Sequence, residues 1–111
     1  MLNKINRLKK RKEYNFIYKK GQVFYTKYLS LYIVKTKNLN SKFGFSVGSK
    51  VGNSVVRHRI KRVLSEIIRQ KVETLPKNNY VFVAKSGCEE ISFNDIKKNI
   101  ELILKKANLE N

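Results

Sequence analysis

The sequence predicts an α+β fold in a single small domain, residues 1–111, with elements in the order α-β-β-β-α-β-α and a mixed sheet packed with helices. The chain has 111 residues, which suits one domain because domains cluster near about 100 to 150 residues. Hydrophobic residues make up 41% of the chain, enough for a small core. Segments of alternating hydrophobicity are interleaved with segments of helical spacing, and a strand-helix-strand succession makes part of the sheet parallel.

The first predicted helix follows a cationic N-terminal segment and ends near Gly21. Tyr14, Ile17 and Tyr18 have the spacing i, i+3, i+4 of one helix face. A short strand is predicted directly after this helix, over residues 22–25.

Two longer strands are predicted over residues 28–35 and 43–48. In the first, Leu29, Leu31 and Ile33 alternate with other residues, so that one face is aliphatic and the opposite face carries tyrosines. The second strand alternates large residues with glycine or serine. Such a face either forms a trough for an extended ligand or marks a glycine bulge.

The second half of the chain predicts a helix, a strand and a helix. Asn53 can cap a long helix with an aliphatic stripe, which ends before Pro76. Residues 80–84 are continuously apolar, which is typical of a central strand covered on both faces. Ser92 and Asp95 have the spacing of a capping box at the start of the last helix.

The charge of the chain is concentrated in its first 71 residues. The formal net charge is +17. Residues 1–71 hold nineteen basic and two acidic side chains, whereas residues 72–111 hold six of each. One side of the domain therefore faces a polyanion, and nucleic acid is the leading class of partner.

The cysteine and histidine content and the hydropathy of the chain indicate in which compartment it works and which kinds of chemical site it can form. Cys88 is the only cysteine, so neither an intramolecular disulfide nor a four-ligand zinc site is expected. His58 is the only histidine and has no second histidine for an acid-base pair. No apolar run approaches the roughly 20 residues of a membrane span. We expect a cytoplasmic protein with no membrane partner, no catalytic residue and no metal ligand of its own.

The long helix carries many cations and one acid, Glu66. We expect His58, Arg62, Ser65 and Arg69 to project away from the aliphatic stripe. A solvated helix usually mixes charges of both signs, so phosphate contact is favoured over a merely soluble face. The candidate residues for binding nucleic acid are Lys50, Arg57, His58, Arg59, Lys61, Arg62 and Arg69.

Tyrosines on a sheet face, beside small residues and a cationic helix, are typical of a single-strand binding surface. Base stacking on an aromatic ring contributes roughly 1 to 3 kcal/mol and depends little on the base. The alternative for each tyrosine is a half-buried core residue with its hydroxyl in water. The cleft candidates are Tyr14, Tyr18, Tyr32 and Ser46, while Tyr25, Tyr28 and Tyr80 are assigned to packing.

Residues 43–47 and 50–62 together resemble the signature of the bacterial ribonuclease P protein subunit. The signature reads roughly Lys-x-Gly-Asn-Ala-Val-x-Arg-Asn-Arg-x-Lys-Arg, and residues 50–62 read Lys-Val-Gly-Asn-Ser-Val-Val-Arg-His-Arg-Ile-Lys-Arg. The resemblance extends to the Arg-Leu-Lys-Lys segment at residues 7–10 and to residues 80–85.

The resemblance implies a small α+β protein that binds the catalytic RNA of ribonuclease P. That enzyme removes the 5′ leader from precursor tRNA by magnesium-assisted hydrolysis. The RNA carries the chemistry, and Mg²⁺ is bound mainly by the RNA subunit and the substrate. The chain would thus be an accessory subunit of an endoribonuclease, and its free form is expected to be a monomer that does not bind DNA.

The resemblance also implies roles for particular segments. The basic helix would lie against the catalytic RNA, and the cleft formed by the sheet and the first helix would receive the single-stranded leader. The strand-helix-strand crossover would be left-handed, although about 98% of such connections are right-handed. The N-terminal basic segment, Arg7, Lys9, Lys10 and Arg11, is expected to be a further site of contact with RNA.

Two positions depart from the family pattern, and other functions stay open. His58 replaces the central Asn of the signature, and Ser49 stands where the family commonly has a second cation. A general basic RNA-binding protein, such as a ribosomal protein or RNA chaperone, would share the size and charge. A self-sufficient small ribonuclease would need an acid-base pair that the sequence does not offer.

Overall fold

Three helices and four strands follow one another in the predicted order α-β-β-β-α-β-α. The computed structural model describes residues 2–37 and 39–109. The helices are α1 (Arg11–Lys20), α2 (Ser54–Arg69) and α3 (Phe93–Lys106), and the strands are β1 (Gln22–Tyr25), β2 (Leu29–Lys35), β3 (Lys42–Val47) and β4 (Asn78–Ala84). Two short 3-10 turns lie at Lys4–Asn6 and Cys88–Glu90. None of the helices in the described residues is long and apolar enough to cross a membrane.

The four strands form one mixed sheet in the order β1-β2-β4-β3. β2 pairs antiparallel with β1 and with β4, whereas β3 and β4 are parallel. The apolar strand β4 is therefore internal, as its sequence predicts. The pairing of β3 with β4 runs without interruption from Lys42 to Val47, so Gly44 lies in a regular strand and not in a bulge.

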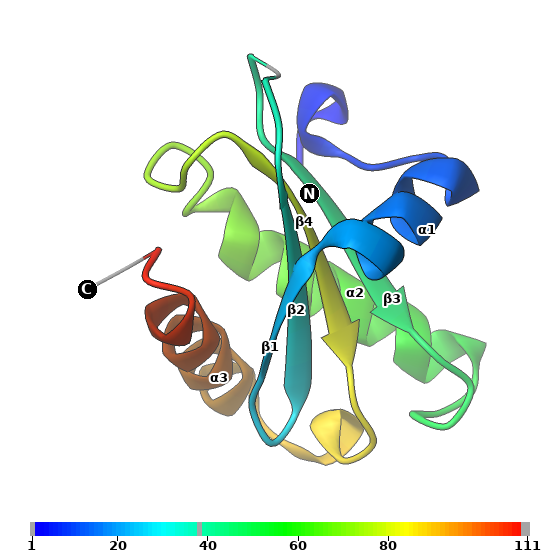
Figure 1. The fold of residues 1–111 in the computed structure, drawn as a ribbon. Coiled ribbons are helices and arrows are strands. Elements are labelled where there is room, and N and C mark those ends of the chain that lie inside the picture. Colours follow the sequence, from blue (N-terminus) through cyan, green and yellow to red (C-terminus); the bar gives the residue numbers. More distant parts are fainter. Residues whose placement is uncertain (1, 38, 110–111) are drawn as a thin grey trace.

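The helices cover the two faces of the sheet unequally. Figure 1 shows α1 in front of the sheet, α2 behind it and α3 beside the β1 edge. β3 and β4 point downward in this view, and the chain passes from β3 behind the sheet through α2 to β4 on its left. This path is left-handed, as the family resemblance implies and against the general rule for such crossovers.

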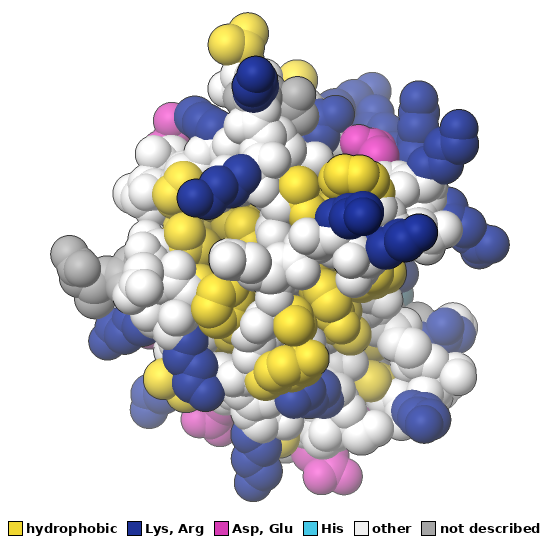
Figure 2. All heavy atoms as spheres, in the orientation of Figure 1, with side chains coloured by type: hydrophobic (Ala, Val, Ile, Leu, Met, Phe, Trp, Pro, Cys, Tyr) yellow, Lys and Arg dark blue, Asp and Glu magenta, His cyan; other side chains and the backbone are white. Residues whose placement is uncertain are grey.

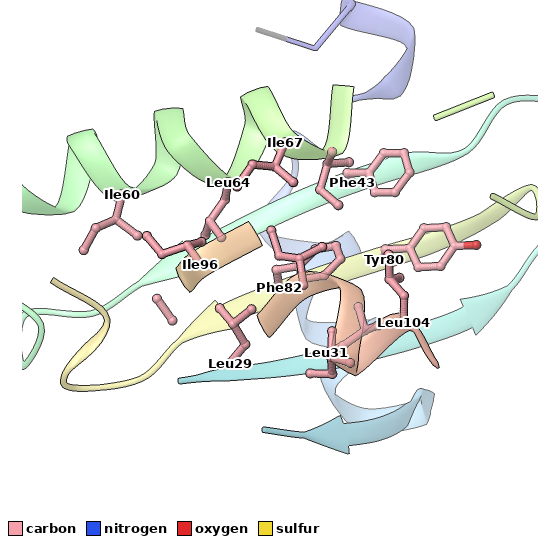
Figure 3. Packing of buried hydrophobic residues seen from close by; sticks show 14 of the residues in the cluster. Leu29, Leu31, Phe43, Ile60, Leu64, Ile67, Tyr80, Phe82, Ile96 and Leu104 are labelled. Carbon is pink, nitrogen blue, oxygen red and sulfur yellow. The ribbon is translucent and has the colours of Figure 1, made fainter. Parts of the chain in front are cut away.

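The main core lies between the sheet and the pair α2 and α3. Figure 3 shows Ile60 and Leu64 of α2 above Phe82 of β4, with Leu104 of α3 beside Leu31 of β2. All five side chains are fully buried. A smaller cluster on the opposite face packs Leu8 and Ile17 against Val81, which fixes α1 above the sheet.

Local side chains begin and end the helices where the sequence predicts. The Asn53 Oδ1 accepts a hydrogen bond of 3.0 Å from the Val56 N–H at the start of α2, which satisfies one of the free amides of the first turn. Ser92 Oγ does the same for α3, at 3.1 Å from the Asp95 N–H. α1 ends at Gly21, whose N–H donates to the Ile17 carbonyl.

The N-terminal segment runs along the outer edge of β3. Arg7 forms a parallel bridge with Phe43, and the Leu8 N–H donates to the Phe43 carbonyl at 3.0 Å. The buried Asn6 side chain donates to the Ser41 carbonyl at 2.8 Å. These contacts cover part of an otherwise open strand edge and place the cations that follow beside α1.

Candidate nucleic-acid interface

Three tyrosines from two elements meet on the α1 face of the sheet. The ring centroids of Tyr18 on α1 and Tyr32 on β2 lie 5.0 Å apart in an edge-to-face arrangement. Tyr14 lies one helical turn before Tyr18, at 6.4 Å between centroids. Tyr18 is 37% exposed, and Tyr32 is half-buried beneath it. Tyr18 is therefore the ring that a base can reach, and Tyr32 supports it from the sheet.

Tyr14 lines this site and packs against β3, so its ring is less available for stacking with a base than that of Tyr18. A Cβ atom placed on Gly44 would lie 2.6 Å from Cε1, Cζ and Oη of Tyr14, so the ring rests directly on the bare backbone of β3. Burial raises the pKa of the Tyr14 phenol, and a hydrogen bond with the backbone of Phe45 partly offsets this rise. Gly44 thus serves to seat Tyr14 and does not leave an empty trough.

A cationic groove lies beside Tyr18, and we call it the tyrosine cleft. It is lined by Lys9, Arg11, Tyr14, Asn15, Tyr18 and Ser46. Figure 2 shows hydrophobic side chains over the sheet face below α1, with Lys and Arg side chains around them. Ring faces next to cations are the two features with which proteins bind single-stranded nucleic acid.

Three of the N-terminal cations, Arg7, Lys9 and Lys10, line one groove together with Glu13 and Lys42, and some of them also reach the neighbouring grooves. Lys9 and Arg11 line the tyrosine cleft. Arg7 lies on the other side of β3, where it lines the groove next to α2. Lys10 is exposed, and its backbone N–H bonds to the Glu13 carboxylate at 3.3 Å before α1 begins.

A second groove joins β3 to the basic helix, and we call it the β3–α2 groove. Its lining includes Arg7, Tyr14, Phe45, His58, Lys61 and Arg62. Tyr14 lines both this groove and the tyrosine cleft. The predicted aromatic and basic sites are therefore neighbours that share one side chain, although they come from opposite faces of the sheet.

A third groove runs between α2 and the start of α3, the α2–α3 groove. His58, Arg59 and Arg62 line it together with Phe93. Arg59 Nη2 donates to the Glu89 carbonyl at 3.2 Å, so this guanidinium is oriented by the 3-10 turn that precedes α3. His58 and Arg62 line both this groove and the β3–α2 groove, so they lie on the ridge of α2 between the two. We call this ridge, together with the neighbouring Arg59 and Lys61, the basic crest.

The remaining predicted cations differ in their surroundings. Arg69 bonds to Glu66 at 2.7 Å through Nη2, and this pairing lowers the pKa of Glu66. Arg57 is half-buried, and its Nε has no hydrogen-bond partner among the described residues. Lys50 is exposed in the turn before α2. Arg69 is thus partly neutralised, while the other two keep their charge available.

Three residues are placed differently from the sequence expectation. Ser65 is buried at 5% exposure, because its short side chain turns inward and bonds to the Arg62 carbonyl. Tyr25, assigned to packing, is 53% exposed. Phe93, not considered as a site residue, is 47% exposed beside Arg59 and Arg62. Helical spacing could not reveal this exposure, because Phe93 precedes Ile96 by three residues and Ile100 by seven and so shares a face of α3 with these buried residues.

Tyr80 and Cys88 are core residues. Tyr80 stacks on Phe43 with 4.9 Å between ring centroids, and its hydroxyl donates to the Pro76 carbonyl at 2.7 Å. Burial raises the pKa of the Cys88 thiol to about 11, so it stays protonated and unreactive at neutral pH. Groups of three or more His, Cys, Asp or Glu that could hold a metal ion are not found in residues 2–37 and 39–109.

The comparisons with known proteins agree with one another. Residues 2–108 match the family model described as Ribonuclease P. The ribonuclease P protein component of Clostridioides difficile (strain 630) is 35% identical over 109 residues, which is 96% of each chain. That of Alkaliphilus oremlandii (strain OhILAs) is 38% identical over 108 residues, covering 96% of this chain and 95% of the relative.

Solved structures show the same fold. The RNase P protein of Staphylococcus aureus superposes with a TM-score of 0.89 at 27% identity, covering 96% of this chain and 98% of that one. The RNase P protein of Thermotoga maritima superposes with a TM-score of 0.81 at 25% identity, covering 90% and 96%. The sequence match over nearly the whole length and the shared topology lead to one conclusion: this chain belongs to the ribonuclease P protein family.

Proposed function

We propose that this chain is the protein subunit of a cytoplasmic ribonuclease P, in which it binds the catalytic RNA and the 5′ leader of precursor tRNA. The observation that carries the proposal is that the aromatic and the basic parts of the site lie next to each other on the surface. Tyr14 lines both the tyrosine cleft and the β3–α2 groove, and the lining of that groove includes His58, Lys61 and Arg62 of α2. One RNA on each side of β3 would be held at a fixed separation.

The leader is the partner that fits the tyrosine cleft. Tyr18 offers a partly exposed ring, and Lys9 and Arg11 offer charges for the phosphates beside it. Stacking tolerates any base, which suits leaders of varied sequence. Ser46 on the floor of the cleft adds a hydroxyl that can donate to or accept from the strand.

The catalytic RNA is the partner that fits the basic crest. His58, Lys61 and Arg62 present their side chains along one side of α2, and Arg59 adds a guanidinium that is already oriented. Cations held on a rigid helix bind phosphates and displace condensed counterions. His58 can still donate or accept a hydrogen bond at the position where the family signature has Asn.

The proposal assigns no magnesium site to the described residues of this chain. Mg²⁺ prefers carboxylate and phosphate oxygens. The two acids next to the site are each paired with a cation, Glu13 with Lys42 at 3.8 Å and Glu66 with Arg69 at 2.7 Å. The proposal therefore leaves Mg²⁺ to the RNA subunit and the substrate, and gives the protein the task of reducing repulsion between two RNAs.

The experiment that tests this function is cleavage of a 5′-extended precursor tRNA at low magnesium. The cognate catalytic RNA is assayed alone and with the protein, next to a protein-only control. We expect cleavage only with the combination. Cleavage by the protein alone would point to a self-sufficient nuclease, and salt-sensitive binding without stimulation would point to a general RNA-binding protein.

Tyr18→Ala tests the leader assignment. We expect the holoenzyme to bind precursor tRNA more weakly by about 1 kcal/mol or more, the lower end for one stacked base, with binding of mature tRNA unchanged. Tyr18→Phe keeps the ring and should bind precursor like the wild type. Equal weakening for precursor and mature tRNA would contradict a leader site at Tyr18.

A further inference from the structure

Tyr25 is an exposed aromatic side chain on the same sheet face as the tyrosine cleft. It lies opposite Ser30 in the β1–β2 pair, while its neighbour Phe24 lies opposite Leu31. Phe24 and Leu31 pack into the core shared with α2 and α3. Tyr25 therefore points to the other face, where α1 lies, and it keeps 53% of its surface exposed.

A continuous row of residues connects Tyr25 with the tyrosine cleft. Tyr25 is paired with Ser30, Ser30 with Val83, and Val83 with Ser46. This row crosses all four strands, and three strand spacings of about 4.8 Å give it a length of roughly 14 Å. The side chains between its two ends are short: Ser30 is 6% exposed and Val83 is half-buried, so neither stands above the sheet as a barrier. A strand lying in the cleft at Ser46 can thus continue across the sheet to Tyr25.

Two lysines lie next to Tyr25, Lys85 over its ring and Lys106 at its backbone carbonyl, and each donates to a backbone carbonyl. Lys85 Nζ lies 5.1 Å from the Tyr25 ring centroid and donates to the Thr26 carbonyl at 2.8 Å. Lys106 Nζ donates to the Tyr25 carbonyl at 2.9 Å. Each ammonium has three donors, so both retain charge and donors for a phosphate. Lys27 lies over the adjacent Tyr28 ring at 5.3 Å.

We propose that Tyr25, Lys85 and Lys106 form a distal subsite for the single-stranded leader, which stacks one base at the β1 edge, upstream of the nucleotide at Tyr18. The inference rests on the proposed function and extends its cleft across the full width of the sheet. An exposed ring next to fixed cations has the chemistry of a single-strand site. Leaders long enough to reach Tyr25 gain affinity, and shorter ones do not.

The test measures the affinity of the holoenzyme for precursor tRNAs whose leaders are lengthened one nucleotide at a time. For the wild type, affinity should rise again once the leader passes Tyr18 and reaches the β1 edge. Tyr25→Ala should abolish this second rise, with about fivefold weaker binding of long leaders, the lower end for one stacked base. Tyr25→Phe should retain it.

Phe16→Ala is the matched control. Phe16 is equally exposed, at 56%, but α1 turns it away from the face that Tyr14 and Tyr18 share. Its removal should leave the affinity of every leader unchanged. An unchanged unfolding midpoint for each variant shows that the fold is intact.

Two outcomes would overturn the inference in different ways. If Tyr25→Ala binds all leaders like the wild type while Tyr18→Ala still weakens precursor, the leader leaves the sheet before β1 and only the distal subsite fails. If neither variant distinguishes precursor from mature tRNA, the proposed leader cleft itself fails. Equal loss with long and short leaders would assign Tyr25 to a contact with the catalytic RNA.

Discussion

Among single residues, Gly44 and Tyr14 show how closely the site depends on one missing side chain. The ring of Tyr14 occupies the space that a Cβ of residue 44 would need. The alternation of large and small residues in β3 predicts a bare strand face, and the structure has one. The sequence does not reveal that Tyr14 fills part of it, because this contact joins residues thirty positions apart.

Gly44→Ala should displace the Tyr14 ring and destabilise the protein by about 1 to 3 kcal/mol, the usual range for overpacking. The free energy of unfolding in urea measures this loss. Gly48→Ala is the matched control, since no atom lies within 4 Å of a Cβ at that position. It should be neutral or stabilising by up to about 1 kcal/mol. Equal losses for both variants would contradict the seating of Tyr14 on Gly44.

The burial of Ser65 and the exposure of Tyr25 could not be predicted from the sequence. Helical periodicity places Ser65 among the outward residues, yet its short side chain lies buried and bonds to the Arg62 carbonyl. A tyrosine in a short strand reads as packing, yet β1 is the edge of the sheet, and α1 does not cover Tyr25. Both outcomes depend on what neighbouring elements cover, which a pattern within one element does not contain.

The ends of the helices and the position of β4 in the sheet could be predicted from capping residues and from the apolar pattern of nearby residues. Asn53 and Ser92 cap α2 and α3 as their spacing predicts, and Gly21 ends α1. The internal position of β4 follows from its continuous apolar run. The left-handed crossover did not follow from any such pattern. The family resemblance alone predicted it. The handedness of a crossover depends on how the elements are connected in space, and a pattern within one element carries no information on this.

Asn53→Ala should cost about 1 kcal/mol of stability, since the first turn of α2 loses its side-chain acceptor. It should also weaken binding to the catalytic RNA, because His58 and Arg57 lie in the turn that follows. Asn53→Asp keeps the acceptor and should restore stability.

Ser92→Ala provides the comparison for this cap. It removes the equivalent bond from α3 and should cost similar stability, measured by thermal unfolding, with a smaller effect on RNA affinity. If both cap variants weaken RNA binding equally, the loss reflects global stability and not the order of α2.

For the whole molecule, the separation of charge is the property that the sequence predicts most directly. The excess of cations in residues 1–71 becomes a surface that includes the tyrosine cleft, the β3–α2 groove and the α2–α3 groove. The last forty residues supply mostly β4 and α3, which complete the core. The sequence could not predict that the two proposed binding regions are adjacent, because β3 brings them together only in the folded state.

Arg62→Ala should reduce the salt dependence of binding to the catalytic RNA. The slope of log K against log salt should lose roughly 0.7 to 0.9 in magnitude, the contribution of one phosphate. Lys98→Ala, an exposed cation on α3 in the neutral part of the chain, should leave the slope unchanged. Identical slopes for wild type and Arg62→Ala would exclude a phosphate contact at Arg62.

The hand of the crossover decides which side of the sheet remains available to a ligand. With the same strand order and directions, a right-handed path from β3 to β4 would carry α2 in front of the sheet. The aliphatic stripe of α2 would then lie over Tyr32 and Ser46, and α3 alone would cover the opposite side. The uncommon hand thus places α2 and α3 on the same face of the sheet. The other face is covered only by α1, so part of it stays open for the proposed RNA ligand.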